Sequence, residues 1–423
     1  MGKKGLTRRQ FTGTAAAAAG AVAASSIGAP YVARGAEKVV KLGFLAPLTG
    51  EVAAWGLPGR DGCLIWADHV NAAGGIKIGD DNYMVEIVSY DDEYLADKAL
   101  IGAKKLVLED DVKLVMMLGG SDAPAAVQFF TKQQMLSSTL LPSDLTPDTL
   151  YHLAPAEVHP IYNVTGVEWL AENHPELKTA AICAQDDELG RPSVATYLAA
   201  FEAAGIDVVY NEFFDINTTD FAPVVTAMLA ENPDILCLDT AYADFVNLIT
   251  ETAINQGFTG QFISCTFDFY PQVGEKVGKE AIEGFIFQFP DFDDEALNAD
   301  HINFDNPNKF YADYNERFPG TWSAVTWEYP AIAEMWKRAA EKAQSIEPMA
   351  VLAAMQEGGR GAHVFGDADW WGSELWGIDN ALVGNWPVVQ IQDGKAKIVE
   401  YRSIIDWWNK HGDLLIKHTE ALS

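Results

Sequence analysis

The chain has 423 residues, of which 49% are hydrophobic and 21% charged, a composition typical of globular proteins rather than disordered or fibrous ones. This length exceeds the size at which a single hydrophobic core keeps growing, so it favours two lobes. The formal net charge of -31 opposes binding to nucleic acid and to anionic membranes, and it disfavours polyanionic ligands.

The N-terminal segment, residues 1–36, reads as a targeting signal and not as part of the fold. It contains the twin-arginine pattern Thr7-Arg8-Arg9-Gln10-Phe11, followed by an alanine-rich run too weakly apolar for a stable transmembrane helix. We therefore expect export through the Tat translocon, cleavage near Ala36 and a soluble mature protein in the periplasm. Losing the five basic residues of this segment would take the net charge from -31 to -36.

After the signal, strand-like and helix-like segments alternate along the chain. The expected strands cover 39–47, 83–90, 114–118 and 138–141, and the expected helices cover 61–73, 94–109 and 123–134. The cycle restarts with strands at 180–184, 208–213, 235–238, 261–265 and 285–289, and helices at 161–172, 193–204, 221–231, 245–256 and 273–277. Two such cycles predict an α/β fold of two doubly wound parallel-sheet lobes that face each other across a cleft.

The last part of the chain departs from this alternation. Helices are expected at 309–317, 325–343 and 349–356 without strands between them, and strands 385–392 and 397–400 form a hairpin around Asp393-Gly394. The tail, residues 403–423, carries Trp407-Trp408, which we expect to pack back on a lobe. Contact of this pair with a membrane or a partner is the open alternative.

The stretch from Gly43 to Ile76 carries a resemblance to a known family. The elements Gly43-Phe44-Leu45-Ala46-Pro47-Leu48-Thr49-Gly50, Trp55-Gly56 and Asn71-Ala72-Ala73-Gly74-Gly75-Ile76 occur in the same order as in type I periplasmic solute-binding proteins. The chain resembles the leucine/isoleucine/valine-binding branch of that family, whose members deliver solutes to ABC importers. The resemblance persists more loosely to about residue 390.

The resemblance also implies how the lobes are built. Three hinge crossovers are expected near 152–158, 290–295 and 360–380. They divide the chain into an N-terminal lobe (37–153 plus 292–365), a C-terminal lobe (154–291 plus 366–402) and the tail 403–423.

Two strand-to-helix turns of the first lobe are candidate ligand sites. In Leu118-Gly119-Gly120-Ser121-Asp122, free backbone N–H groups at a helix start could hold a carboxylate, and the resemblance places Ser121 in the loop that binds the ligand's acid group. Ser121 or Asp122 could instead be a simple helix cap. The next turn contains Ser143 and Asp144, where the family usually has small and hydroxyl residues. Asp144 either points into the cleft, where it needs a cation or N–H donors, or caps a helix.

The other candidates come from loop ends elsewhere in the chain. They are Trp55 in the first lobe, Leu189, Asp239, Tyr242, Phe267 and Asp268 in the second, and Trp327 on a returning helix. The resemblance assigns an aromatic residue to the place of Leu189, which puts that stacking contact in question. For each aromatic residue, packing in the core is the alternative.

Rings and acids together are typical of a site for cations, because aromatic faces attract ammonium groups and carboxylates neutralise them. We therefore expect a ligand with an amine or other cationic group, with or without a carboxylate held near Ser121.

Catalytic, cofactor and metal motifs are missing from the sequence. It contains neither Gly-x-Ser-x-Gly nor His-Glu-x-x-His, its histidines are scattered, and its four cysteines have no Cys-x-x-Cys spacing. The sequence thus argues against an enzyme and a cofactor. The resemblance implies a receptor for a small amino acid, amide or amine, partnered by an ABC permease of the inner membrane. A periplasmic sensor of the same fold and a periplasmic α/β enzyme are the alternatives.

Overall fold

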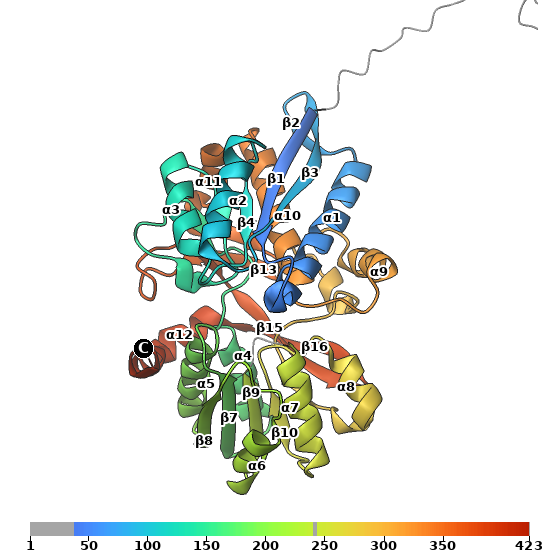
Figure 1. Ribbon diagram of the computed structural model, residues 1–423, viewed down its shortest axis with the longest axis vertical. Coiled ribbons are helices and arrows are strands. Elements are labelled where there is room, and N and C mark those ends of the chain that lie inside the picture. The colour runs from blue at the N-terminus through green and yellow to red at the C-terminus, as the bar shows by residue number, and fades with distance from the viewer. Residues whose placement is uncertain (1–37, 240–242, 423) are drawn as a thin grey trace, which may run out of the picture. The chain divides into compact units, whose positions relative to one another are not determined.

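Two β-sheets, each covered by helices, organise the chain in the computed structural model, which describes residues 38–239 and 243–422 (Figure 1). The strands of the first sheet run in the order β2-β3-β1-β4-β5-β6. Their bounds are β1 Lys38–Ala46, β2 Ile76–Ile78, β3 Asp81–Asp91, β4 Val115–Met117, β5 Ser137–Ser138 and β6 His152–Leu153. All neighbours are parallel except β2 and β3. The second half of β1 is continuously buried, as expected for a central strand of a parallel sheet.

Helices from both ends of the described chain cover this sheet. They are α1 Leu57–Ala72, α2 Ala96–Leu108, α3 Ala123–Gln133, α9 Pro307–Arg317, α10 Val325–Ala343 and α11 Pro348–Met355, with short 3-10 turns η1 Glu51–Trp55 and η2 Pro142–Asp144. Figure 1 shows the orange α10 and α11 among the blue elements of the N-terminal part. The chain therefore returns to the first lobe after residue 300.

Helices α1 and α10 pack closely because α1 presents two glycines to α10. A Cβ atom on Gly59 would lie 2.2 Å from Cδ2 of Tyr329, and one on Gly62 would lie 2.1 Å from the backbone oxygen of Thr326. Any larger residue at either position would push the helices apart. This contact fixes the first turns of α10.

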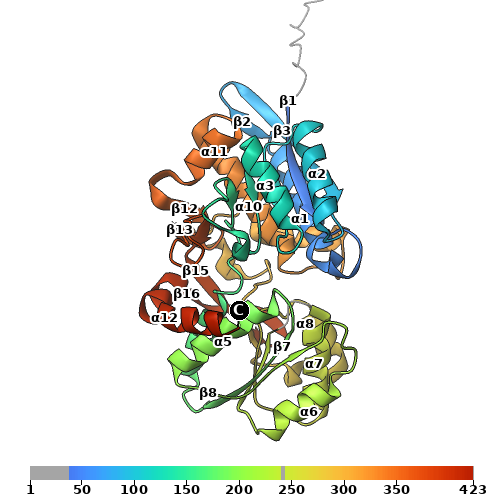
Figure 2. The same ribbon diagram turned by 60° about the vertical axis from the view of Figure 1, so that its left-hand side comes forward.

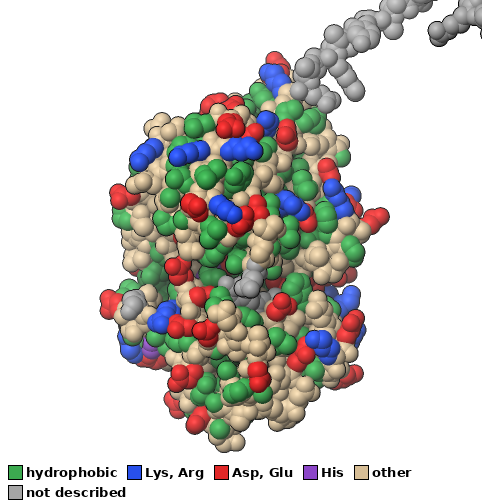
Figure 3. Space-filling model, in the orientation of Figure 1, with side chains coloured by type: hydrophobic (Ala, Val, Ile, Leu, Met, Phe, Trp, Pro, Cys, Tyr) green, Lys and Arg blue, Asp and Glu red, His purple; other side chains and the backbone are tan. Residues whose placement is uncertain are grey.

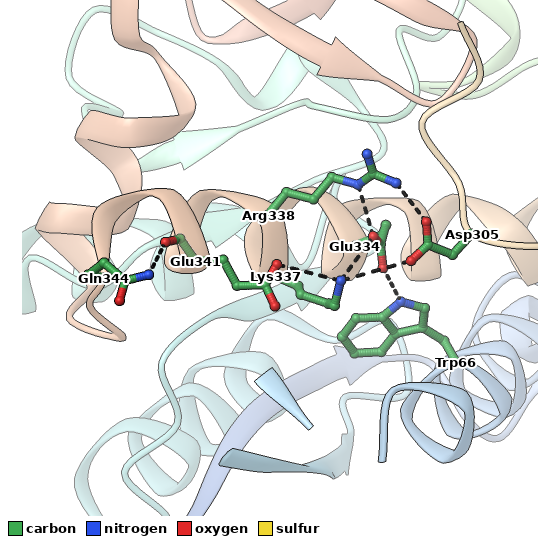
Figure 4. Close-up of polar contacts among 7 residues, drawn as sticks. All are labelled: Trp66, Asp305, Glu334, Lys337, Arg338, Glu341 and Gln344. Carbon is green, nitrogen blue, oxygen red and sulfur yellow. Dashed lines mark hydrogen bonds and ion pairs between the residues drawn. The ribbon is translucent and has the colours of Figure 1, made fainter. Parts of the chain in front are cut away.

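A polar network at the other end of α10 ties it to α1 and to the loop before α9 (Figure 4). Glu334 is almost completely buried and accepts hydrogen bonds from Trp66 Nε1 and Arg338 Nε, each at 2.9 Å. Arg338 also donates to Asp305 at 2.9 Å, and Lys337 lies 3.5 Å from Glu334. The buried carboxylate of Glu334 is thus fully paired, and it holds α10 in place.

The second sheet has the strand order β16-β15-β11-β10-β9-β7-β8. Its bounds are β7 Thr179–Gln185, β8 Asp207–Phe214, β9 Ile235–Asp239, β10 Gln261–Ile263, β11 Ile286–Phe287, β15 Asn385–Gln392 and β16 Lys395–Ser403. The five strands from β7 to β11 are parallel, whereas β15 and β16 form an antiparallel hairpin at one edge. The covering helices are α4 Asn163–Asn173, α5 Gly190–Ala204, α6 Ala222–Ala230, α7 Ala243–Asn255 and α8 Tyr270–Val277, with the 3-10 turn η3 Lys279–Ala281. The 3-10 turn η4 Glu295–Asn298 follows and contacts α9.

A small third sheet joins segments where the chain passes between the two large sheets. It contains β12 Arg360–His363, β13 Gly366–Trp371 and β14 Ala381–Val383, after the 3-10 turn η5 Glu357–Gly359. Ala154 N–H donates to Asn380 O, and Leu382 N–H donates to Ala154 O, both at 2.9 Å. Two crossing segments therefore lie side by side. The resemblance implied a hinge strand near 360–380, but the sequence pattern did not predict a sheet of three strands.

The tail forms helix α12, Ile404–Leu422, which packs along α5 (Figure 2). Trp407 and Trp408 are buried, which confirms that this pair packs back on the protein. Across residues 38–239 and 243–422, no helix has the length and apolarity needed to cross a membrane.

The fold class predicted from the sequence, two parallel-sheet lobes of α/β type, is confirmed. The exact residue bounds assigned to each lobe remain a prediction.

Candidate functional site

A cavity lies where loops of both large sheets meet, and we call it the inner cavity. It is lined by Val52, Trp55, Tyr94, Leu118, Leu140, Leu141, Glu157, His159, Tyr162, Leu189, Cys265, Thr266, Phe289, Ala324 and Glu328. Most of these residues follow the carboxyl end of a strand or stand at a helix start, where ligands bind in α/β proteins.

Aromatic rings form much of the inner cavity's wall. Tyr162 stacks on Trp386 with ring centroids 4.9 Å apart and meets Phe289 edge-on at 5.1 Å. Trp386 is itself fixed by a 2.8 Å hydrogen bond from its Nε1 to the backbone oxygen of Gln288. Trp55, on η1, has no hydrogen-bond partner for its Nε1 among the described residues. Rings held this firmly can receive a cation without rearranging.

Three carboxyl groups, Glu157, Asp268 and Glu328, form what we call the acid cluster. Glu157 and Glu328 line the inner cavity and are 8% and 0% exposed, and both are electrostatically coupled to Asp268. Tyr162 Oη donates to Glu157 Oε1 at 3.0 Å. Neither oxygen of Glu328, nor Oδ2 of Asp268, has a partner among the described residues.

Burial dominates the electrostatics of the acid cluster. It raises the pKa of Glu157 to about 8 and that of Asp268 to about 7, and it raises the pKa of Glu328 well above its ordinary value. Repulsion between the carboxylates raises these pKa values further. A buried acid without a partner is costly in the empty protein, and a cation would remove that cost.

No lysine or arginine is among the residues that line the inner cavity. Burial lowers the pKa of His159 to about 4, so this imidazole is neutral at pH 7. The described part of the chain also lacks any group of three His, Cys, Asp or Glu residues arranged to hold a metal ion. The described lining therefore offers the acid cluster no cationic side chain.

A wider space adjoins the inner cavity, and we call it the outer groove. It has an empty volume of about 1350 Å³ and is lined by Gly120, Ser121, Pro124, Leu141, Ser143, Asp144, Glu188, Arg191, Pro192, Ala195, Thr419 and Leu422. Leu141 lines both spaces, and the end of α12 contributes the last two residues. Arg191 is paired with Asp186 at 2.7 Å.

Asp144 binds the neighbouring glycine loop. The N–H of Gly120 donates to both carboxylate oxygens of Asp144, at 3.0 and 3.1 Å. The hydroxyl of Thr139 donates to Oδ2 of Asp144 at 2.9 Å. Gly119 must be glycine here, because its φ is +98° and a Cβ atom would lie 2.3 Å from Asp144 Oδ2. Burial raises the pKa of Asp144 to about 7 in spite of these donors.

Asp122 lies behind the outer groove and faces another acid. It is fully buried, and its carboxyl group is hydrogen-bonded to that of Asp92, also fully buried. Burial and the neighbouring Asp92 raise the pKa of Asp122. Above it, Tyr94 is hydrogen-bonded to Ser121.

The candidate residues from the sequence fall into separate groups in space. Trp55 and Leu189 line the inner cavity, and Asp268 belongs to the acid cluster beside it. Ser121 and Ser143 line the outer groove together with Asp144, whereas Asp122 is buried behind it.

Two of the aromatic candidates pack in the core, which was the alternative to ligand contact in the sequence analysis. Phe267 is fully buried and stacks on Phe285 at 3.9 Å, and Trp327 is fully buried and stacks on Phe292 at 5.3 Å. Neither lines the inner cavity or the outer groove. Asp239 ends β9, but its side chain and all of Tyr242 fall outside the described residues.

Sequence reasoning missed Glu157, His159, Tyr162 and Glu328. Glu328 did carry a signal, because it is the only charged residue in the otherwise uncharged start of α10, Val325–Ala333. Glu157 follows the short strand β6 and has no comparable pattern around it.

Comparison with known proteins gives a consistent picture. A family model described as "Periplasmic binding protein" matches residues 39–396. A leucine-binding protein from Thermotoga maritima is similar in structure, with a TM-score of 0.68 and 17% identity over 87% of this chain and 100% of that one.

Two further solved structures share the fold. One is an ABC-transporter solute-binding protein from Rhodopseudomonas palustris in complex with 3,4-dihydroxybenzoic acid (TM-score 0.69, 17% identity, 87% of this chain, 98% of that one). The other is a branched-chain amino acid transporter substrate-binding protein from Streptococcus pneumoniae in complex with isoleucine (TM-score 0.66, 18% identity, 86% and 100%). Since the family model spans most of the sequence, the chain belongs to the periplasmic binding protein family, whose members are ligand-binding receptors and not enzymes.

Proposed function

We propose that this protein is the exported substrate-binding receptor of an ABC importer and that its solute is a small organic amine. The observation that carries the ligand class is Glu328, a fully buried carboxyl group that lines an aromatic cavity and has no partner among the described residues. Glu157 and Asp268 add to the same negative potential. An ammonium group would satisfy these carboxylates and contact the surrounding rings at the same time.

The proposed mechanism uses loops of both lobes. The solute would enter an open cleft and meet Trp55 and Leu189 from opposite lobes in the inner cavity. The closed form becomes favoured because only it makes both sets of contacts. This closed form would then dock on an inner-membrane permease. A solved structure of the same fold whose title names an ABC transporter supports this partner.

Export is the remaining part of the proposal. The twin-arginine pattern at Arg8 and Arg9 favours the Tat route, which delivers already folded proteins to the periplasm. The family's periplasmic character supports the same destination.

Isothermal titration calorimetry on the mature protein tests the ligand class. The panel contains primary amines, amino acids, neutral amides and aromatic carboxylates. We expect amine-bearing compounds to bind, and Glu328→Gln to weaken that binding at least about 100-fold, because a charge-assisted contact to a buried carboxylate is lost. Glu176→Gln, an exposed acid outside the cavity lining, is the control and should bind like the wild type. Binding to plain or aromatic carboxylates alone would refute the proposal.

A further inference from the structure

The carboxylate of Asp144 occupies an anion-binding position at the strand ends of the first lobe. Both of its oxygens accept from the backbone N–H of Gly120, and Oδ2 also accepts from Thr139. The short turn η2 holds it there, since the N–H of Asp144 donates to Leu141 O at 3.0 Å. Donors of this kind, at a loop between a strand and a helix, are those that otherwise hold a ligand's anionic group.

This position adjoins the ligand space. Asp144 lines the outer groove, and Leu141, three residues earlier, lines both the groove and the inner cavity. A carboxylate carried by a solute in the inner cavity would have to compete with Asp144 for the N–H of Gly120. It would also approach the coupled acids Asp92 and Asp122, which lie behind the same loop.

The inner cavity offers a ligand carboxylate no cationic side chain. Its described lining contains no lysine or arginine, its His159 is neutral at pH 7, and it contains Glu157 and Glu328. Once a bound ammonium has ionised these glutamates, they would repel a ligand carboxylate, which would also lose its hydration in this buried space.

We propose that the solute is an organic cation without a carboxylate group, because Asp144 takes the place that an amino acid's carboxylate would need. This inference rests on the proposed function and narrows it from amine-bearing solutes in general to amines that are not amino acids.

Matched pairs of probes that differ by one carboxylate test the inference on the wild-type mature protein. The pairs are 3-methylbutylamine and leucine, phenethylamine and phenylalanine, and putrescine and ornithine, each measured by titration calorimetry. We expect the best-bound amine to exceed its amino acid at least about tenfold in affinity. If an amine binds but its amino acid binds equally or better, the inference fails and the proposed function stands. If amino acids bind and no amine does, both fail.

A substitution at Asp144 tests the same idea from the side of the protein. Asp144→Ser frees the N–H of Gly120 and removes the competing charge. The leucine-to-amine affinity ratio should rise at least about tenfold. Ser143→Ala on the same turn is the matched control and should leave the ratio unchanged. If the serine variant does not fold, Asp144→Asn replaces it in the test. Because asparagine keeps an acceptor for the N–H of Gly120, it should raise the leucine-to-amine affinity ratio less than serine does. An unchanged ratio in a folded Asp144 variant would overturn the inference.

Discussion

At the scale of single residues, the protein contains two buried glutamates on one helix with opposite consequences. Glu334 is paired with Trp66 and Arg338, whereas Glu328 has no partner among the described residues. The first stabilises the empty protein, and the second costs it stability that a ligand would restore. Changing Glu328 should therefore lower the affinity for the ligand but not the stability of the empty protein. Changing Glu334 should lower the stability but not the affinity.

We predict that Glu328→Gln raises the free energy of unfolding of the empty protein at pH 8, by about 1.4 kcal/mol for each pKa unit by which the fold raises the pKa of Glu328, because glutamine is neutral without taking up a proton. Because the pKa of Glu328 is raised in the folded state, this gain should fade toward pH 4, where the carboxyl group is neutral in both states. Glu334→Gln should lower stability and leave amine binding intact. Thermal and denaturant unfolding with calorimetry checks both. Equal effects of the two variants on binding would contradict the assignment.

The acid cluster also predicts proton release on binding. In the empty protein the pKa is about 8 for Glu157 and about 7 for Asp268, so both are partly protonated near neutral pH. A bound ammonium, whose own pKa is near 10, favours the ionised forms and expels protons. Affinity should therefore fall roughly tenfold or more from pH 8 to pH 6. The other groups facing the cluster are Asp291, which repels Asp268, and the neutral His159.

Calorimetry at pH 7 in phosphate and in Tris measures this release, because the two buffers differ in ionisation enthalpy. We expect about one proton to leave per ligand bound. An affinity that does not change between pH 6 and pH 8, with no buffer dependence of the heat, would show that the cluster does not meet the ligand's charge.

Sequence reasoning at this scale predicted a cationic ligand and named only some of the residues that line the inner cavity. Acids and rings at loop ends predicted a cation, and Trp55 and Leu189 do line the inner cavity. Phe267 and Trp327 could not be separated from core residues, because an aromatic ring after a strand has the same pattern whether it faces a cavity or a neighbouring strand. Asp144 was recognised as unusual, and the sequence left two roles open for it, as a cleft residue that needs a cation or N–H donors or as a helix cap. The structure shows that it accepts from the N–H of Gly120.

At the scale of elements, the position of Glu328 depends on how closely α10 approaches α1. That approach relies on Gly59 and Gly62, two glycines one helical turn apart. Thr326, which contacts Gly62, is two residues from Glu328, so a shift of the helix there would move the carboxylate.

We predict that Gly62→Ala destabilises the protein by about 1–3 kcal/mol through overpacking and weakens amine binding by displacing the start of α10. The added carbon would lie 2.1 Å from Thr326 O, a backbone atom that cannot yield without moving the helix. Gly274→Ala in α8 is the control, since its added carbon would come no closer than 3.3 Å to the end of the Ile282 side chain. Unfolding curves and titration calorimetry measure both effects. Unaltered stability and affinity in Gly62→Ala would show that the close contact is not needed.

Most helices and strands were predictable from hydrophobic periodicity, because the alternation of buried strands and amphipathic helices is regular through residue 289. The small sheet of β12, β13 and β14 was not, since its strands are short and Gly-rich or lie near turns. Its strand β14 also forms a bridge with Ala154, which is more than 200 residues away in the sequence. Contacts of that range leave no local pattern.

At the scale of the whole molecule, the acidity of the protein agrees with a cationic solute. The formal net charge is -31, and Figure 3 shows acidic side chains over both the upper and the lower part of one face. A strongly negative surface raises the local concentration of cations and repels anions, more so at low ionic strength. The same sign of charge thus extends from the surface to the acid cluster.

The two-lobed architecture was the most predictable feature, because chain length and two successive α/β cycles both require it. The return of the chain to the first lobe came only from the family resemblance, since helices without intervening strands do not show which sheet they cover. The solute could not be named from either, because the lining of the inner cavity depends on Glu157 and Glu328 meeting in space across 171 residues of sequence.

Identification of the small molecule that copurifies with the protein tests the central claim most directly. The full chain would be exported in a host grown on complex medium and purified without denaturation. Native mass spectrometry would detect the bound ligand, which would then be released and identified by tandem mass spectrometry. We predict a singly or doubly charged organic cation without a carboxylate, and its absence from Glu328→Gln. A bound amino acid or aromatic carboxylate that is retained by Glu328→Gln would contradict the account.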